Sequence, residues 1–231
     1  MGDFLALSVD TLAEPAVLQA LRLSAVVALA TLLLHATAAV LLGYALSRRS
    51  WPGRALLDVA ITLPLVFPPM ALGFVLLLLL GRQGVFGRWL LSCCHVELLF
   101  STPAVVLASF VAGLPLVVKP VQAAMESLSA RLGEVARTLG KREWEIALLV
   151  LLPNVKRALA TGLVLGLGRS LGEVGITLML GGNIVGRTNT VSLEIFNAVT
   201  GGEFDRALVL TLLLGVVSVL VFLGLRRLGT S

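Results

Sequence analysis

Apolar residues occur along this chain in long blocks separated by shorter polar segments. Five blocks run roughly from Ala20 to Ser47, Ala55 to Leu80, Val96 to Val118, Ala158 to Leu180 and Ala207 to Leu225. A helix needs about 20 apolar residues to cross the hydrocarbon core of a bilayer. Because the backbone finds no hydrogen-bond partner in lipid, each block is predicted to be a helix. The pattern predicts an all-α integral membrane protein with five transmembrane helices; five such lengths in succession disfavour a soluble fold with buried core helices.

The composition and the distribution of basic residues agree with this and add an orientation. Of 231 residues, 58% are apolar and 13% are charged, whereas soluble domains carry about 25% charged residues. Twelve lysines and arginines lie between blocks one and two, between blocks three and four, or after block five; five lie on the opposite side. Since basic residues accumulate in cytoplasmic loops, the N-terminus is predicted outside and the C-terminus in the cytoplasm.

The longest polar segment, residues 119–157, falls on the predicted cytoplasmic side. Its second half reads EVARTLGKREWEIALLVLLP, residues 134–153. The apolar spacing predicts two short helices, with Gly140 as the turn between them and Pro153 as the end of the second. A loop of this length usually has structure or function. An amphipathic segment lying on the lipid surface is the alternative.

This segment resembles the EAA loop of importer-type ABC transporter permeases, in which Glu-x-Ala-x-x-x-Gly is followed by an apolar residue, any residue, Leu and Pro. The matching residues are Glu134, Ala136, Gly140, Val150, Leu152 and Pro153. Val135 and Val150 stand where the family usually has Ala and Ile, and both remain apolar. The resemblance implies an importer-type ABC permease bundle, with residues 1–231 as a single transmembrane permease domain.

In that family the loop forms a coupling helix that inserts into a groove on the ATP-binding subunit. The candidate coupling residues are Glu134, Ala136, Arg137, Leu139 and Gly140. We expect Ala136 and Gly140 to form a small-residue face for close approach, rimmed by polar residues that include Arg142. No GxxxxGKS or GxxxxGKT segment is present, so no cofactor is expected in this chain and ATP would be bound by the partner subunit.

Three further segments narrow the resemblance to the molybdate and tungstate permeases. They read ITLPLVFPPMALGF at 61–74, GRQGVFGRWL at 81–90 and GRSLGEVGITLMLGGNIVGRTNT at 168–190. Sulfate permeases share much of this pattern, so a sulfate or thiosulfate permease is the alternative. The resemblance implies a multi-pass protein of the cell inner membrane that forms a homodimer. Its other partners would be an ABC ATP-binding subunit, an external oxyanion-binding protein and membrane lipid, with no nucleic acid.

The candidate translocation-path residues lie in blocks two and four. Arg169 and Glu173 are four residues apart and are expected to meet on one helix face, with Ser170 beside them. Charges at such depth usually face the bundle interior or a water-filled path, so they either line the pathway or form a permanent structural pair. Pro64 and Pro68, with the adjacent proline, should kink or break block two, as in many transporter paths, or merely bend it.

Two other classes of function are disfavoured. An intramembrane enzyme would need a nucleophile with a base, or paired carboxylates, and Glu173 has no second carboxylate in its block. A passive channel has no use for a docking loop for an ATPase. The sequence contains no zinc, CxxC or EF-hand motif, and the adjacent Cys93 and Cys94 provide no disulfide framework.

Overall fold

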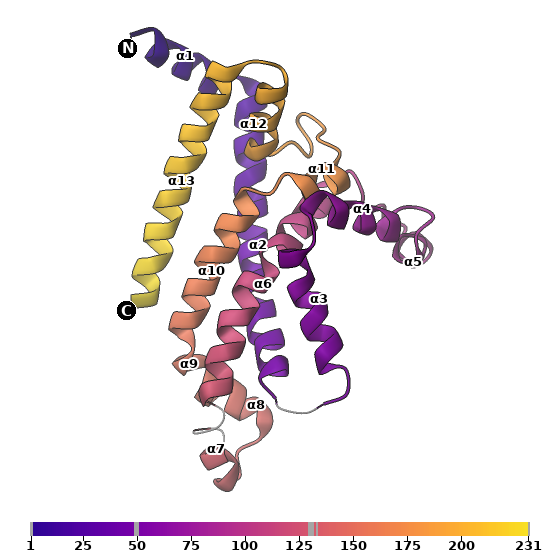
Figure 1. Cartoon of the computed structure of the whole chain (residues 1–231), viewed down its shortest axis with the longest axis vertical. Coiled ribbons are helices and arrows are strands. Elements are labelled where there is room, and N and C mark those ends of the chain that lie inside the picture. The colour runs from indigo at the N-terminus through magenta and orange to yellow at the C-terminus, as the bar shows by residue number, and fades with distance from the viewer. Residues whose placement is uncertain (1, 49–50, 129–131, 133, 231) are drawn as a thin grey trace.

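The structure, a computed structural model, describes residues 2–48, 51–128, 132 and 134–230, and regular structure within these residues is helical throughout. Figure 1 shows a bundle of long helices with two smaller helices extending sideways. The elements are α1 (Gly2–Ala13), α2 (Pro15–Ser47), α3 (Arg54–Val66), α4 (Pro69–Leu80), α5 (Val85–Cys94), α6 (Thr102–Leu128), α7 (Glu134–Thr138), α8 (Glu143–Glu145), the π-helix η2 (Ile146–Leu151), α9 (Leu152–Asn154), α10 (Lys156–Leu171), α11 (Gly175–Gly181), α12 (Val191–Thr200) and α13 (Phe204–Thr230).

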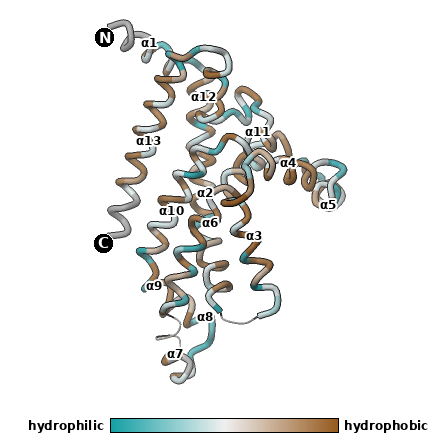
Figure 2. The backbone as a smooth tube through the Cα atoms, viewed as in Figure 1, coloured by the Kyte–Doolittle hydropathy of each residue, from teal (hydrophilic) through white to brown (hydrophobic). Residues whose placement is uncertain are grey.

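Three of the described helices, α2, α6 and α13, are each long and apolar enough to cross a membrane. The count rises to at most five when each of two bent helix pairs is taken as one span. Helix α6 is the most enclosed: 56% of its apolar window is buried, against 22% in α2 and 17% in α13. The apolar outer faces of α2 and α13 (Figure 2) suit contact with lipid. Five spans and their orientation remain predictions.

Two of the five apolar blocks are divided in the structure, one at its prolines and one where no break was predicted. The block from Ala55 to Leu80 forms α3 and α4, with the break at Phe67 and Pro68, as the prolines suggested. Pro64, however, lies inside α3 without ending it. The block from Ala158 to Leu180 is divided between α10 and α11, a break that the sequence analysis did not predict.

Two predicted boundaries of the long polar segment are also wrong. Helix α6 continues to Leu128, so the segment from Lys119 onward begins as helix instead of loop. Pro153 lies within the short helix α9, and the chain changes direction at Val155 instead. Leu151 and Leu152 keep right-handed helical backbone angles between η2 and α9, so the helical run continues through Pro153 and ends at Asn154.

Glycines allow α2, α6 and α10 to pack closely. A Cβ on Gly166 would lie 2.2 Å from Val117 Cγ2 of α6, and one on Gly113 would lie 2.5 Å from His35 Cε1 of α2. At the same crossing, His35 Nε2 lies 2.9 Å from the carbonyl oxygen of Phe110. Gly162 of α10 also faces Val117. Gly162 and Gly166 therefore allow close packing of α10 against α6 within one chain.

Candidate coupling loop and translocation path

The breaks in the two divided blocks lie against each other. A Cβ on Gly175, at the start of α11, would lie 3.1 Å from Pro69 Cβ and from Met70 N at the start of α4. One turn along, a Cβ on Gly73 would lie 3.0 Å from Ile176 Cα. We call these contacts between α4 and α11 the break junction. Transporters often place substrate paths at discontinuous helices, and this junction joins two of them.

Glu173 connects the end of α10 to the start of α11. One carboxylate oxygen, Oε2, lies 2.6 Å from Arg169 Nη1, and the other accepts a hydrogen bond of 2.7 Å from the backbone N–H of Ile176. The Glu173 side chain is 1% exposed, whereas that of Arg169 is 32% exposed. The predicted pairing is therefore present, and the carboxylate additionally satisfies a free N–H in the first turn of α11. That second contact was not foreseen, because it depends on a helix break between the two residues.

Serine side chains fix the C-terminal end of α10. Ser170, 6% exposed, donates a hydrogen bond of 2.7 Å to the carbonyl of Ser109 in α6. Ser192 of α12 donates to the carbonyl of Leu171, one of the last carbonyls of α10. The bond from Ser192 satisfies a carbonyl that the end of α10 leaves without an intrahelical partner, and the bond from Ser170 ties α10 to the interior of α6. Ser170 acts here as a packing residue, and its role in a path stays a prediction.

Arg169 borders an apolar groove of about 330 Å³ between α10 and α13. The groove is lined by Val164, Leu165, Gly168, Arg169, Leu171, Ser218, Val219, Val221 and Phe222. Because Glu173 neutralises Arg169 and the remaining lining is almost entirely apolar, this geometry favours a structural pair over a site at which Arg169 binds the transported anion.

The proline candidates of block two lie at the other break. Pro68 precedes α4 in an extended conformation, and its neighbour Pro69 is the proline that contacts α11.

The two predicted short helices of the EAA-like segment are present, and Gly140 separates them with φ +74°. Leu139 is 75% exposed, and a Cβ on Gly140 would meet nothing within 4 Å. The side chains of Glu134 and Arg137 lie outside the described residues. Two exposed apolar residues that the sequence analysis did not include among its candidates, Trp144 and Leu149, extend the surface.

Ala136 is the exception among the coupling candidates, and the expectation that it forms part of a docking face is wrong. It is 6% exposed and packs in a cluster with Ile146 and Leu151 of the same loop and Val121 and Met125 of α6. Its small side chain lets α7 approach the bundle, so it anchors the loop instead of presenting it.

Polar contacts stiffen the turn that follows Gly140. The backbone N–H of Arg142 donates a hydrogen bond of 2.8 Å to Glu145 Oε2, and Lys141 Nζ lies 3.2 Å from Glu145 Oε1. The hydrogen bond from Arg142 and the neighbouring Lys141 lower the pKa of Glu145. The carboxylate therefore stays ionised and holds the start of α8.

At the opposite end of the bundle, Arg206 at the start of α13 joins three acidic residues. Its guanidinium lies 2.9 Å from Glu14, 3.0 Å from Glu203 and 3.4 Å from the buried Glu194. The segment 182–190 after α11 contains turns, with positive φ at Gly182, Asn183 and Gly186. The two asparagine side chains of Asn183 and Asn197 are hydrogen bonded at 2.6 Å.

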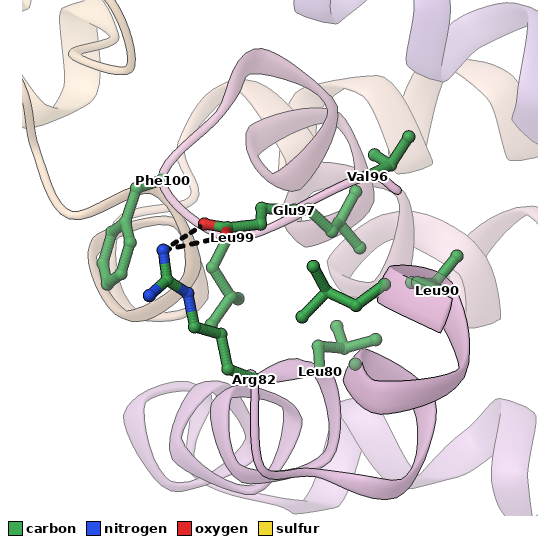
Figure 3. A pocket seen from close by; sticks show the side chains of 10 residues that line it. Leu80, Arg82, Leu90, Val96, Glu97, Leu99 and Phe100 are labelled. Carbon is green, nitrogen blue, oxygen red and sulfur yellow. Dashed lines mark hydrogen bonds and ion pairs between the residues drawn. The ribbon is translucent and has the colours of Figure 1, made fainter. Parts of the chain in front are cut away.

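A cavity of about 350 Å³ lies where α4 turns into α5 (Figure 3). Leucine side chains such as Leu80, Leu90 and Leu99 surround it, and Arg82 and Glu97 pair at 2.7 Å at its edge. Glu97 raises the pKa of Arg82. Both side chains are largely exposed, so the pair is worth little in stability, and its charges already satisfy each other.

Residues 36–230 match the family model described as "Binding-protein-dependent transport system inner membrane component". The chain is 34% identical over 215 residues to the molybdenum transport system permease protein ModB of Escherichia coli K12, covering 91% of this chain and 94% of that protein. Against ModB of Haemophilus influenzae the identity is 33%, with 88% and 91% covered. The sulfate transport system permease protein CysW of Synechocystis is 35% identical, with 87% and 74% covered.

Among solved structures, the chain resembles a subunit in the crystal structure of a bacterial alginate ABC transporter in complex with alginate pentasaccharide-bound periplasmic protein. The TM-score is 0.78 and the identity 20%, covering 96% of this chain and 83% of that one. At this identity the likeness concerns the fold. The two chains therefore share the same helical fold.

Proposed function

We propose that this chain transports an oxyanion and that molybdate is the preferred candidate. The chain belongs to the family of binding-protein-dependent transport system inner membrane components, and it is a permease subunit of an ABC importer. Two relatives named for molybdenum transport match over more than nine tenths of their own length, whereas the sulfate relative CysW matches over about three quarters of its length. Tungstate follows molybdate as a tetrahedral dianion of similar size, and sulfate is the alternative substrate.

We propose that the working assembly is a homodimer with two ATP-binding subunits and an external binding protein in the inner membrane. The observation that carries this proposal is the surface around Gly140. Leu139, Trp144 and Leu149 are exposed there, at an end of the bundle where the chain also passes through hydrophilic residues (Figure 2). Exposed aromatic residues such as Trp144 are typical centres of protein interfaces. This end would face the cytoplasm and dock on the ATPase.

Figure 1 shows the N-terminus and the C-terminus at opposite ends of α13, consistent with an odd number of crossings. The proposed orientation puts the Arg206 end outside, where the binding protein would dock. A reporter that is active only in the cytoplasm, fused after Ser231, should be active. Activity of a periplasm-only reporter at the same position would reverse the orientation.

The docking role is tested with two matched glycine variants. Gly140 and Gly202 have φ of +74° and +78°, and a Cβ at either would meet nothing within 4 Å. Leucine at either position introduces the same left-handed strain, about 1–2 kcal/mol, but only Gly140 lies in the coupling loop. Gly140→Leu should lose co-purification with the ATP-binding subunit, whereas Gly202→Leu, at the opposite end of the bundle, should keep it. Equal co-purification of the two variants would argue against docking through this loop.

Substrate choice is tested with the complete importer in vesicles that contain its binding protein. Uptake of labelled molybdate should be blocked by excess unlabelled molybdate or tungstate and much less by sulfate. Block by sulfate at the same excess would favour the sulfate alternative, and it would leave the role of the coupling loop untouched.

A further inference from the structure

Tyr44, the single tyrosine of the chain, joins α2 to the coupling loop. Its hydroxyl donates to Glu143 Oε2 at 2.6 Å and lies 3.2 Å from the backbone carbonyl oxygen of the same residue. The two residues are 99 positions apart in the sequence. The tyrosine ring is half-buried against the cluster that contains Ile146 and Leu151, so packing holds the ring while the hydroxyl reaches α8.

The helix end that carries Tyr44 is itself part of a polar network. Arg54 of α3 donates to the carbonyl of Leu46 at 2.8 Å and pairs with Glu126 of α6 at 2.9 Å. Lys119 of α6 pairs with Asp58 of α3. Leu46, Ile61 and Val118 form an apolar cluster beneath these contacts. The ends of α2, α3 and α6 are therefore joined, and we call them the three-helix base.

The described contacts between the loop and this base differ in kind. Ala136, Ile146 and Leu151 attach the loop through apolar packing, which is non-directional. The Tyr44–Glu143 contact is short, directional and made to a carboxylate, and such bonds are stronger than neutral ones. Glu143 is also the first residue of α8, so a displacement of α8 must carry Tyr44 with it or break the bond.

We propose that the Tyr44–Glu143 hydrogen bond positions the coupling loop on the three-helix base and transmits its movement to α2 and α3. Helix α3 leads to Pro68 and the break junction, so the base connects the loop to the proposed path. The inference rests on the proposed function, in which the loop docks on an ATPase. Tyr44 and Glu143 are positioning residues: they act through the helices and do not contact substrate.

Tyr44→Phe keeps the ring and removes the hydroxyl. In the complete transporter we expect this variant to assemble with the ATP-binding subunit at the wild-type ratio. Substrate imported per ATP hydrolysed should fall about tenfold, since hydrogen bonds to charged groups are among the stronger ones. Glu143→Gln retains a side-chain oxygen that accepts the bond, so it should keep clearly more of this ratio than Glu143→Leu. Adding Tyr44→Phe to Glu143→Leu should lower the ratio only slightly further, through the backbone contact.

Ser24→Ala is the matched control. Ser24 Oγ accepts a hydrogen bond of 3.0 Å from the backbone N–H of Val191 near the other end of α2, so its loss removes a tertiary contact of the same helix far from the loop. A comparable fall in imported substrate per ATP in Ser24→Ala, or an unchanged ratio in Tyr44→Phe, would overturn the inference. Should Tyr44→Phe fail to fold, equal ratios for Glu143→Gln and Glu143→Leu would overturn it.

The same measurements separate this inference from the proposed function. If the wild-type chain does not co-purify with an ATP-binding subunit, the proposed function is wrong and the inference falls with it. If the wild-type complex forms and imports substrate while Tyr44→Phe matches it, only the inference fails.

Discussion

The break between α3 and α4 and the break between α10 and α11 meet in space but have different origins. Pro68 precedes α4 and Pro69 occupies its first turn, so consecutive prolines interrupt the chain locally. The other break contains no proline. It is held by Glu173, which binds Arg169 on one side and the N–H of Ile176 on the other, and by Ser192, which satisfies the carbonyl of Leu171.

The difference predicts how each break responds to mutation. A break imposed by two adjacent prolines is redundant, because either proline alone disfavours a continuous helix. Of the described side-chain contacts that hold the second break, removal of the buried Glu173 carboxylate leaves only the hydrogen bond from Ser192 to Leu171. The first break should therefore tolerate single substitutions, and the second should not.

The largest effect is expected for Glu173→Ala. It leaves Arg169 without its carboxylate and the N–H of Ile176 without an acceptor, at a site where Glu173 is 1% exposed. Breaking a buried ion pair costs about 3–5 kcal/mol. Thermal unfolding of the purified protein in detergent should show the loss. A stability within error of wild type would mean that other contacts hold this break.

Neutralising both charges should be less damaging than the two single changes together. Arg169→Gln strands a buried carboxylate, whereas Glu173→Gln strands a guanidinium that is a third exposed, so the first should be the worse single variant. The double variant should recover about 2 kcal/mol relative to additivity. Strict additivity in unfolding would show that the pair contributes nothing as a pair.

Uptake by the same double variant separates the two roles left open for this pair. Near-normal uptake identifies Arg169 and Glu173 as structural. A folded double variant without uptake would show that one of the charges also serves transport.

Gly175→Ala should have an intermediate effect at the junction itself. The new methyl group would lie 3.1 Å from Pro69 Cβ and Met70 N, closer than comfortable packing allows. Overpacking of this kind costs about 1–3 kcal/mol. Gly168→Ala, where the added Cβ would meet nothing within 4 Å, is the control, and equal unfolding temperatures would show that α4 and α11 separate easily.

The smallest effect is expected for Pro68→Ala. Pro69 still disfavours a helical conformation at the preceding residue, so the break should persist, and stability should change by less than about 1 kcal/mol. Pro68→Ala combined with Pro69→Ala should cost more than either alone. A large loss from Pro68→Ala by itself would remove the contrast between the two breaks.

Much of the structure of the EAA-like segment, residues 134–153, was predictable because its signals are local. The turn at Gly140 follows from the permissive backbone of glycine, and the two short helices follow from apolar spacing. The orientation of Ala136 was not predictable, since a small residue on a helix face suits a partner as well as its own bundle. Trp144 and Leu149 were identifiable as apolar residues beside charges, but whether they are exposed depends on packing against α2 and α6.

The sequence by itself determined the helical blocks, the interruption at Pro68, the turn at Gly140 and the spacing that lets Arg169 and Glu173 meet. Each of these depends on the hydropathy or backbone freedom of a residue and its near neighbours. Only the tertiary structure decided where α10 ends, that the two breaks touch, and that Tyr44 reaches Glu143. These features depend on hydrogen bonds and close contacts between residues distant along the chain, and such contacts exist only once the helices have packed.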